Sequence, residues 1–250
     1  MSAWIPAPDG RPAAGPARRA LSWGILVWAL YLVARTLVQR LVPAADWAAG
    51  VRQDEIITGF RLACGAAVCV LYARCWALSA LLRWRRVGFW VWAGCGLLVA
   101  AHLSNALSLQ IPAWFDWRVI AIDLAVGFNE EVSYRGLFQR ALSELKGPAW
   151  GEWVGSLMFA AMHLGYQPLP ELGWIFAWGL GAAKLRSRGA PMALLIAAHW
   201  LADCAYVVIW RRSALPLPWL AWVRVACLAG ALGAAWLAGR ARPGSGTAAA

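Results

Sequence analysis

Residues 119–139 read VIAIDLAVGFNEEVSYRGLFQ, an apolar run that is long enough to cross a bilayer and carries two adjacent glutamates near its middle. A membrane-spanning helix needs about 20 mainly apolar residues. The run is therefore predicted to be a transmembrane helix. Ionisable groups inside a membrane are costly and mark functional sites, so Glu130 and Glu131 become the first candidates for a site.

Similar apolar runs fill most of the chain. Of the 250 residues, 62% are hydrophobic and 14% are charged, whereas soluble domains hold about 45–50% apolar and about 25% charged residues. The predicted fold class is therefore all-α: a polytopic transmembrane helical bundle of about eight spans with a buried polar site. The predicted spans are 21–39, 57–82, 87–109, 119–141, 150–165, 171–185, 190–210 and 217–238.

The formal net charge of +11 comes mainly from basic residues between the apolar runs. No basic arm with interleaved aromatic residues is present, so we expect no nucleic-acid partner; the bilayer itself is the expected partner. With the N-terminus in the cytoplasm, most loop lysines and arginines fall on the cytoplasmic side, although Arg211 and Arg212 fall outside. The expected location is the bacterial inner membrane, with both termini cytoplasmic.

Polar residues inside three of the predicted spans are candidates for one shared site. Arg135 follows Glu131 by four residues, so the two side chains share a helix face and can form an ion pair. Glu130 points about 100° away, which leaves its carboxylate for a cavity. Alternatively, the Glu131–Arg135 pair only fixes helix packing.

Two of the three histidines lie in later spans. His163 ends the sequence FAAMH, which begins at Phe159, and His199 precedes Asp203 by four residues. Asp203 can accept a hydrogen bond from the His199 imidazole and fix its tautomer. The third histidine, His102, is interpreted as structural. Asp123 lies two turns before Glu130 on the same face, and the remaining intramembrane arginines (Arg61, Arg74 and Arg224) receive no role.

These residues resemble the three motifs of the CPBP family, which comprises type II CAAX prenyl endopeptidases and bacterial bacteriocin-processing or Abi proteins. The motifs are Glu-Glu-x-x-x-Arg at 130–135, Phe-x-x-x-His at 159–163 and His-x-x-x-Asp at 199–203. The resemblance implies that Glu130 activates water with help from His163. It also implies that Glu131, Arg135 and Phe159 support the site, and that His199 and its partner stabilise the oxyanion.

One position departs from the family pattern. The partner of the last histidine is often asparagine, but here it is Asp203, and an ionised carboxylate donates no hydrogen bond. Asp203 is therefore expected to orient His199 or to help hold a metal. Whether a divalent metal such as zinc binds at Glu130, His163 and His199 stays open, since two histidines and a carboxylate are an adequate ligand set but no H-E-x-x-H motif is present.

The predicted organisation has four parts. A disordered cytoplasmic head covers 1–20, transmembrane helices without motifs cover 21–114, a CPBP-like catalytic helical core covers 115–212, and the last span with a disordered tail covers 213–250. The first span exceeds a signal-peptide core and is expected to be an uncleaved anchor. The six cysteines form no C-x-x-C pair and are interpreted as apolar helix residues.

The sequence thus predicts an intramembrane endopeptidase that hydrolyses a peptide bond of a membrane-associated protein or peptide, at a membrane-proximal or C-terminal cleavage site. No serine or cysteine lies in a nucleophile motif, so attack by water is favoured over an acyl-enzyme. Two other classes stay open. One is a non-catalytic immunity or scaffold protein of the same family, and the other is an ion-coupled transporter, for which the sequence lacks the usual internal repeat.

Overall fold

The structure is a computed structural model that describes residues 14–42, 47–82, 87–108, 117–164, 167–208 and 218–240. Within these ranges the chain is helical and contains no strand, so the all-α prediction is confirmed. The elements are α1 (Ala14–Leu41), α2 (Trp47–Cys75), α3 (Leu78–Leu82), α4 (Phe89–Ser108), α5 (Trp117–Glu131), the π-helix η1 (Val132–Phe138), α6 (Gln139–Lys146), α7 (Pro148–Ala161), α8 (Leu169–Ser187), α9 (Met192–Val208) and α10 (Pro218–Arg240).

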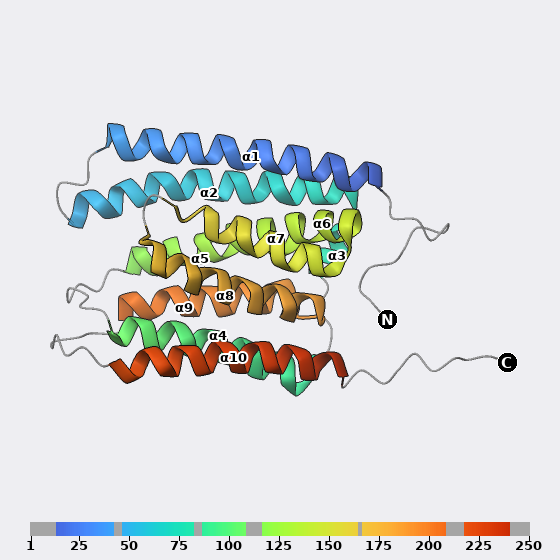
Figure 1. The fold of residues 1–250 in the computed structure, drawn as a ribbon. Helices are drawn as coiled ribbons and strands as arrows, with labels where there is room; N and C mark the ends of the chain where they lie inside the picture. The colour runs from blue at the N-terminus through green and yellow to red at the C-terminus, as the bar shows by residue number, and fades with distance from the viewer. Residues whose placement is uncertain are drawn as a thin grey trace.

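The long helices lie side by side in one bundle (Figure 1). Helix α1 packs on α2, α5 on α9, α7 on α8, and α4 on α10. Each predicted span corresponds to one helix or to consecutive helices, with α5, η1 and α6 forming the fourth. The first residue of α1 and the last residue of α10 lie at the same end of the bundle, as an even number of crossings requires (Figure 1).

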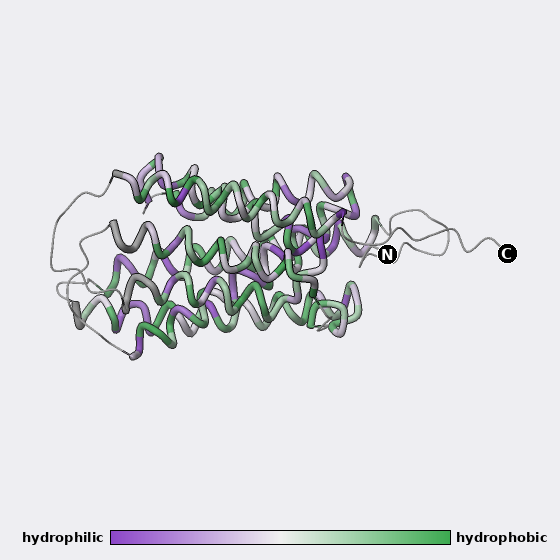
Figure 2. Tube along the Cα trace, turned by 90° about the horizontal axis from the view of Figure 1, so that it is seen from below, coloured by the Kyte–Doolittle hydropathy of each residue, from purple (hydrophilic) through white to green (hydrophobic). Residues whose placement is uncertain are grey.

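The outer surface of the bundle is apolar. Three helices are long and apolar enough to cross a membrane by length and composition: 14–41, 49–75 and 219–240. Hydrophobic residues prevail along the helices (Figure 2). Leu30 on α1 is 61% exposed and Trp222 on α10 is 74% exposed, and such surfaces are stable in lipid but not in water. The protein is an integral membrane protein.

The predicted disordered head is wrong over its last residues. Helix α1 begins at Ala14, so the last seven residues of the predicted head, 14–20, are helical, and they include Arg18 and Arg19. Ala17 and Ala20 are fully buried, so tertiary packing extends the helix beyond the apolar run. Residues 1–13 and the predicted disordered tail, 241–250, lie outside the described residues, as do the predicted domain borders near 114 and 212.

The second span also differs from its prediction, 57–82. Helix α2 starts at Trp47, and the helix breaks after Cys75 before the short α3. The indole Nε1 of Trp76, at the break, donates to Glu144 Oε2 of α6 over 3.0 Å. The Arg140 guanidinium lies 4.6 Å from the Trp76 ring. These contacts join residues far apart in sequence, so no local pattern predicted the break.

The π-helix η1 directly follows the two glutamates and was not predicted. Its i→i+5 pattern is visible where the Gln139 backbone N–H donates to the Tyr134 carbonyl. Every residue of η1 is buried. Short π-helical segments inside α-helices occur frequently at functional sites, and this one carries the arginine of the first motif, Arg135.

Candidate active site

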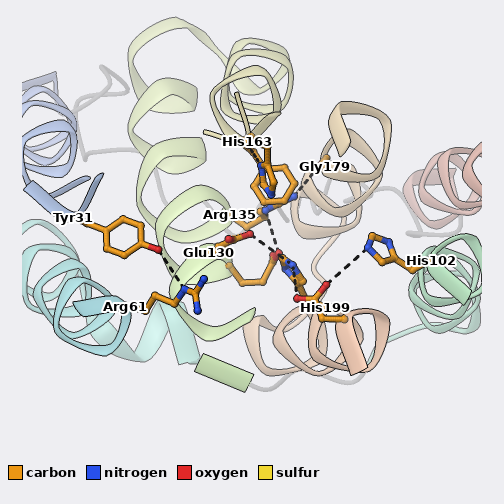
Figure 3. Close-up of polar contacts among 11 residues, drawn as sticks. Tyr31, Arg61, His102, Glu130, Arg135, His163, Gly179 and His199 are labelled. Atoms are coloured by element: carbon orange, nitrogen blue, oxygen red, sulfur yellow. Dashed lines mark hydrogen bonds and ion pairs between the residues drawn. The ribbon is translucent and has the colours of Figure 1, made fainter. Parts of the chain in front are cut away.

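The two glutamates lie at the end of α5, in the centre of the bundle, with different partners. Glu131 is 0% exposed, and its Oε1 lies 3.1 Å from Arg135 Nη1 and 2.8 Å from His199 Nδ1. The predicted ion pair with Arg135 is therefore confirmed. Glu130 is 6% exposed, and its Oε2 lies 3.7 Å from His199 Nε2. Glu131 is thus held between the Arg135 guanidinium and the His199 imidazole. Glu130 faces the other edge of the same imidazole (Figure 3).

His199 reaches the glutamates because α9 packs tightly on α5. A Cβ built on Gly127 would lie 3.3 Å from both the Ile196 carbonyl oxygen and the Trp200 backbone nitrogen, so a larger residue here would move α9 away by a few tenths of an ångström. The His199 Nδ1–H donates to the Glu131 carboxylate, which fixes the ring and directs Nε2 toward Glu130.

Phe159 links the elements around this cluster. The Arg135 guanidinium lies 4.1 Å from the centre of the Phe159 ring, a cation–π distance, and Arg135 Nη2 donates to the Gly179 carbonyl of α8 over 3.5 Å. The Phe159 ring centroid lies 5.2 Å from that of His163 and 6.1 Å from that of His199. The second motif therefore supplies a hydrophobic wall that contacts both histidines.

His163 lies just beyond the last residue of α7, in the turn 162–164. Its Nδ1–H donates to the Phe159 carbonyl over 2.9 Å, so Nε2 is the basic nitrogen of the neutral ring. Glu130 and His199 both interact electrostatically with this imidazole. The two histidines are thus connected through the Phe159 ring, which lies against both, and through Glu130, which interacts electrostatically with His163 and lies 3.7 Å from His199.

The three predicted motifs therefore come together from α5 with η1, from α7 and from α9. Comparison with protein families gives the same segment: residues 112–205 match the family model described as type II CAAX prenyl endopeptidase Rce1-like. These residues form an Rce1-like domain. The match agrees with the predicted family, and it supports a protease. No curated protein and no solved structure matches the chain.

Asp203 has one partner inside the Rce1-like domain, His199, and one outside it, His102. Its Oδ2 lies 3.5 Å from His199 Nε2, and its Oδ1 lies 3.9 Å from Nε2 of His102 on α4. His102 was interpreted as structural and separate from the motifs, and the structure instead places it at the edge of the cluster (Figure 3). Its ring centroid is 5.9 Å from that of Trp178, which in turn is 4.7 Å from that of His199.

Two further charged residues outside the motifs belong to the same polar region. Asp123, one of whose carboxylate oxygens is buried without a hydrogen-bond partner among the described residues, interacts electrostatically with Asp203, Arg61 and His199. Arg61 of α2 was given no role in the sequence, but its guanidinium lies inside the bundle near Glu130 (Figure 3). The only local signal for either residue was a charge within an apolar run. By contrast, Arg224 pairs with Glu171 at 3.0 Å.

The possible metal site was predicted at Glu130, His163 and His199. Among the described residues, no three histidine, cysteine, aspartate or glutamate side chains are grouped as metal ligands. Arg135 and His199 already engage one oxygen of Glu131, and Phe159 engages Nδ1 of His163. The described residues thus show no grouped ligand set, and a metal at Glu130, His163 and His199 stays a prediction.

Proposed function

We propose that the chain is an intramembrane endopeptidase that hydrolyses a peptide bond of a membrane-associated protein or peptide, with water activated by Glu130. The observation that carries the proposal is the unequal environment of two adjacent buried carboxylates. Glu131 is occupied by Arg135 and by His199 Nδ1, whereas Glu130 faces His199 Nε2 at 3.7 Å. A buried carboxylate held beside an imidazole suits general-base catalysis.

In the proposed reaction, Glu130 takes a proton from water as the water oxygen attacks the peptide carbonyl carbon. The electron pair of the carbonyl bond moves to the oxygen and forms a tetrahedral oxyanion. His199 in its protonated form stabilises the negative charge from Nε2, since Nδ1 is held by Glu131. Collapse of the intermediate breaks the C–N bond, and the proton held by Glu130 passes to the leaving amine, with His163 assisting the transfer.

Asp203 orients His199 in this proposal and does not contact the oxyanion. Its Oδ2 lies 3.5 Å from His199 Nε2, and a carboxylate that is only an acceptor adds orientation and charge balance at this position. The route is proposed to be independent of metal, because Glu130 with the two histidines can carry every proton transfer. The metal content of the purified protein, measured together with its activity, tests this part.

The substrate class and the orientation are also part of the proposal. We propose a peptide or protein anchored in the membrane, cleaved near the membrane or near its C-terminus, and an enzyme in the bacterial inner membrane with both termini in the cytoplasm. Helix α1 begins and α10 ends at the same end of the bundle, which supports termini on one side of the membrane (Figure 1). Labelling of cysteines introduced at the two ends, in intact and lysed cells, tests it.

The test of function compares membrane-anchored proteins, by quantitative proteomics, in cells that carry the wild-type protein or Glu130→Gln. The amide keeps the shape of the side chain but cannot take a proton from water. A substrate should be shortened by the wild type and should stay intact with Glu130→Gln, and the purified variant in liposomes should cleave it at least about 10²-fold more slowly. Near-normal turnover by Glu130→Gln would refute the proposal. Binding without cleavage by the wild type would instead indicate a scaffold protein.

A further inference from the structure

Arg61 is a buried cation from outside the Rce1-like domain that lies beside the proposed catalytic base. Its Nε donates to the Tyr31 hydroxyl of α1 over 3.3 Å. In Figure 3, Glu130 lies between the Arg61 guanidinium and His199. Asp54 and Glu130 both interact electrostatically with Arg61. A guanidinium in the interior of a membrane bundle is costly, so its position near the reacting groups requires an explanation.

The packing of α2 on α5 brings Arg61 to this place. A Cβ built on Gly65 would lie 2.7 Å from Cε1 of Phe128 and 3.5 Å from Cα of Asn129, so α2 lies close to α5 in the residues just before Glu130. Arg61 precedes Gly65 by four residues, about one helical turn, and therefore lies on the same face of α2. The glycine thus makes the close contact, and the turn beside it carries the arginine toward the carboxylate.

The guanidinium keeps an unused donor at this position. Arginine has five N–H donors in a rigid fork, and Nη1 of Arg61 is buried without a hydrogen-bond partner among the described residues. Burying a donor without an acceptor destabilises the folded protein, so folding by itself does not explain this arrangement. An acceptor that enters with the substrate would satisfy it. A peptide substrate brings such an acceptor in every carbonyl oxygen.

The third motif does not supply a second hydrogen-bond donor for the oxyanion. Asp203 stands where asparagine is common, and its carboxylate accepts hydrogen bonds but cannot give one to an oxyanion. His199 uses Nδ1 on Glu131, so a single N–H remains at Nε2. A tetrahedral oxyanion is stabilised best by two or more convergent donors. Arg61 Nη1 is the unused donor on the other side of Glu130.

We propose that Arg61 is a catalytic residue whose Nη1–H donates to the carbonyl oxygen of the scissile peptide bond and stabilises the oxyanion that forms there. The inference rests on the proposed function. As the water oxygen bonds to the carbonyl carbon, the carbonyl electron pair moves onto the oxygen beside the guanidinium, and Glu130 takes the water proton. When the C–N bond breaks, the oxygen regains its double bond and the amine takes the proton from Glu130.

Two other roles for Arg61 make different predictions. A purely structural cation would balance the surrounding acids (Asp54, Asp123, Asp203 and Glu130), and its removal would lower stability without a specific effect on kcat. A site for the C-terminal carboxylate of the substrate would change KM for peptides with a free carboxylate and leave amidated peptides unaffected. An oxyanion donor would lower kcat for both kinds of peptide, with little change in KM.

The experiment uses the full chain in liposomes and a peptide from the substrate found with Glu130→Gln, in free-acid and amidated forms. The variants are Arg61→Gln, Arg61→Lys and, as the matched control on the exposed end of the same helix, Arg74→Gln. Arg61→Gln should lower kcat by about 10²- to 10³-fold on both peptides with KM within about threefold, the size of effect seen for loss of one oxyanion donor. Arg61→Lys should recover part of the rate, and Arg74→Gln should match the wild type.

A phosphinic peptide, which carries a tetrahedral anion at the scissile position, provides a second measurement. Its affinity should fall in Arg61→Gln by about the same factor as kcat/KM, whereas the affinity of the substrate itself, measured in the Glu130→Gln background, should not change. Unaltered kcat in Arg61→Gln or Arg61→Lys, or a KM effect confined to the free-acid peptide, would overturn the inference while the proposed function stood. If the wild type cleaves nothing, the proposed function fails first and this inference fails with it. If Arg61→Gln does not fold, Arg61→Lys decides.

Discussion

Replacing Glu131 by glutamine should destabilise the protein more than the loss of any ion pair at its surface. The Glu131 side chain is 0% exposed, and one of its oxygens lies 3.1 Å from Arg135 Nη1 and 2.8 Å from His199 Nδ1. Without this carboxylate, the Arg135 guanidinium, 2% exposed, becomes a buried charge without its partner. Removing one partner of a buried ion pair costs about 3–5 kcal/mol, so we expect a loss of this size in the free energy of unfolding.

The measurement is reversible unfolding in mixed micelles, followed by tryptophan fluorescence. The matched control is Glu55→Gln, which removes the Glu55–Arg118 pair, where the side chains are 41% and 37% exposed and the N–O distance is 3.4 Å. An exposed pair of this kind contributes about 0–1 kcal/mol. The double variant Glu131→Leu with Arg135→Leu should be more stable than Glu131→Leu alone, because no charge is left unpaired. Equal losses in the free energy of unfolding of Glu131→Gln and Glu55→Gln would show that the buried ion pair contributes no more stability than the exposed one.

Three further predictions concern the third motif and the helix that carries it. Asp203→Asn should keep part of the activity because the amide can still accept a hydrogen bond from His199, and Asp203→Ala should lose about tenfold more activity. A parallel loss of bound metal in both variants would instead identify Asp203 as a metal ligand. His102→Leu should lower kcat about tenfold in the wild type, the size of a lost orienting contact, and should have no further effect in Asp203→Ala if His102 acts through Asp203. Additive losses in the double variant would contradict this coupling. Gly127→Ala should cost about 1–3 kcal/mol of stability and should also lower activity, because the added Cβ meets the α9 backbone at 3.3 Å and α9, which carries His199, must shift by a few tenths of an ångström. Wild-type stability would show that α9 adjusts freely.

The sequence was sufficient for the features that depend on neighbours along the chain. Apolar runs predicted the helices, since a helix in lipid satisfies its own backbone hydrogen bonds and needs only length and hydrophobicity. The spacing of four residues predicted the contact between Glu131 and Arg135, which the structure confirms at 3.1 Å. The three motifs predicted the family, and the family match covers the segment that contains them, residues 112–205.

Only the tertiary structure decided which distant residues join the polar centre. The hydrogen bond from His199 to Glu131 spans 68 positions, and it exists because Gly127 allows α9 to approach α5. His102 and Arg61 carried no motif and were set aside, yet α4 and α2 bring them to the same centre (Figure 3). Periodicity and spacing report contacts within one helix, whereas contacts between helices depend on side-chain volumes at several packing surfaces at once. The sequence therefore determined the helices and the motif residues, and packing determined the composition of the site.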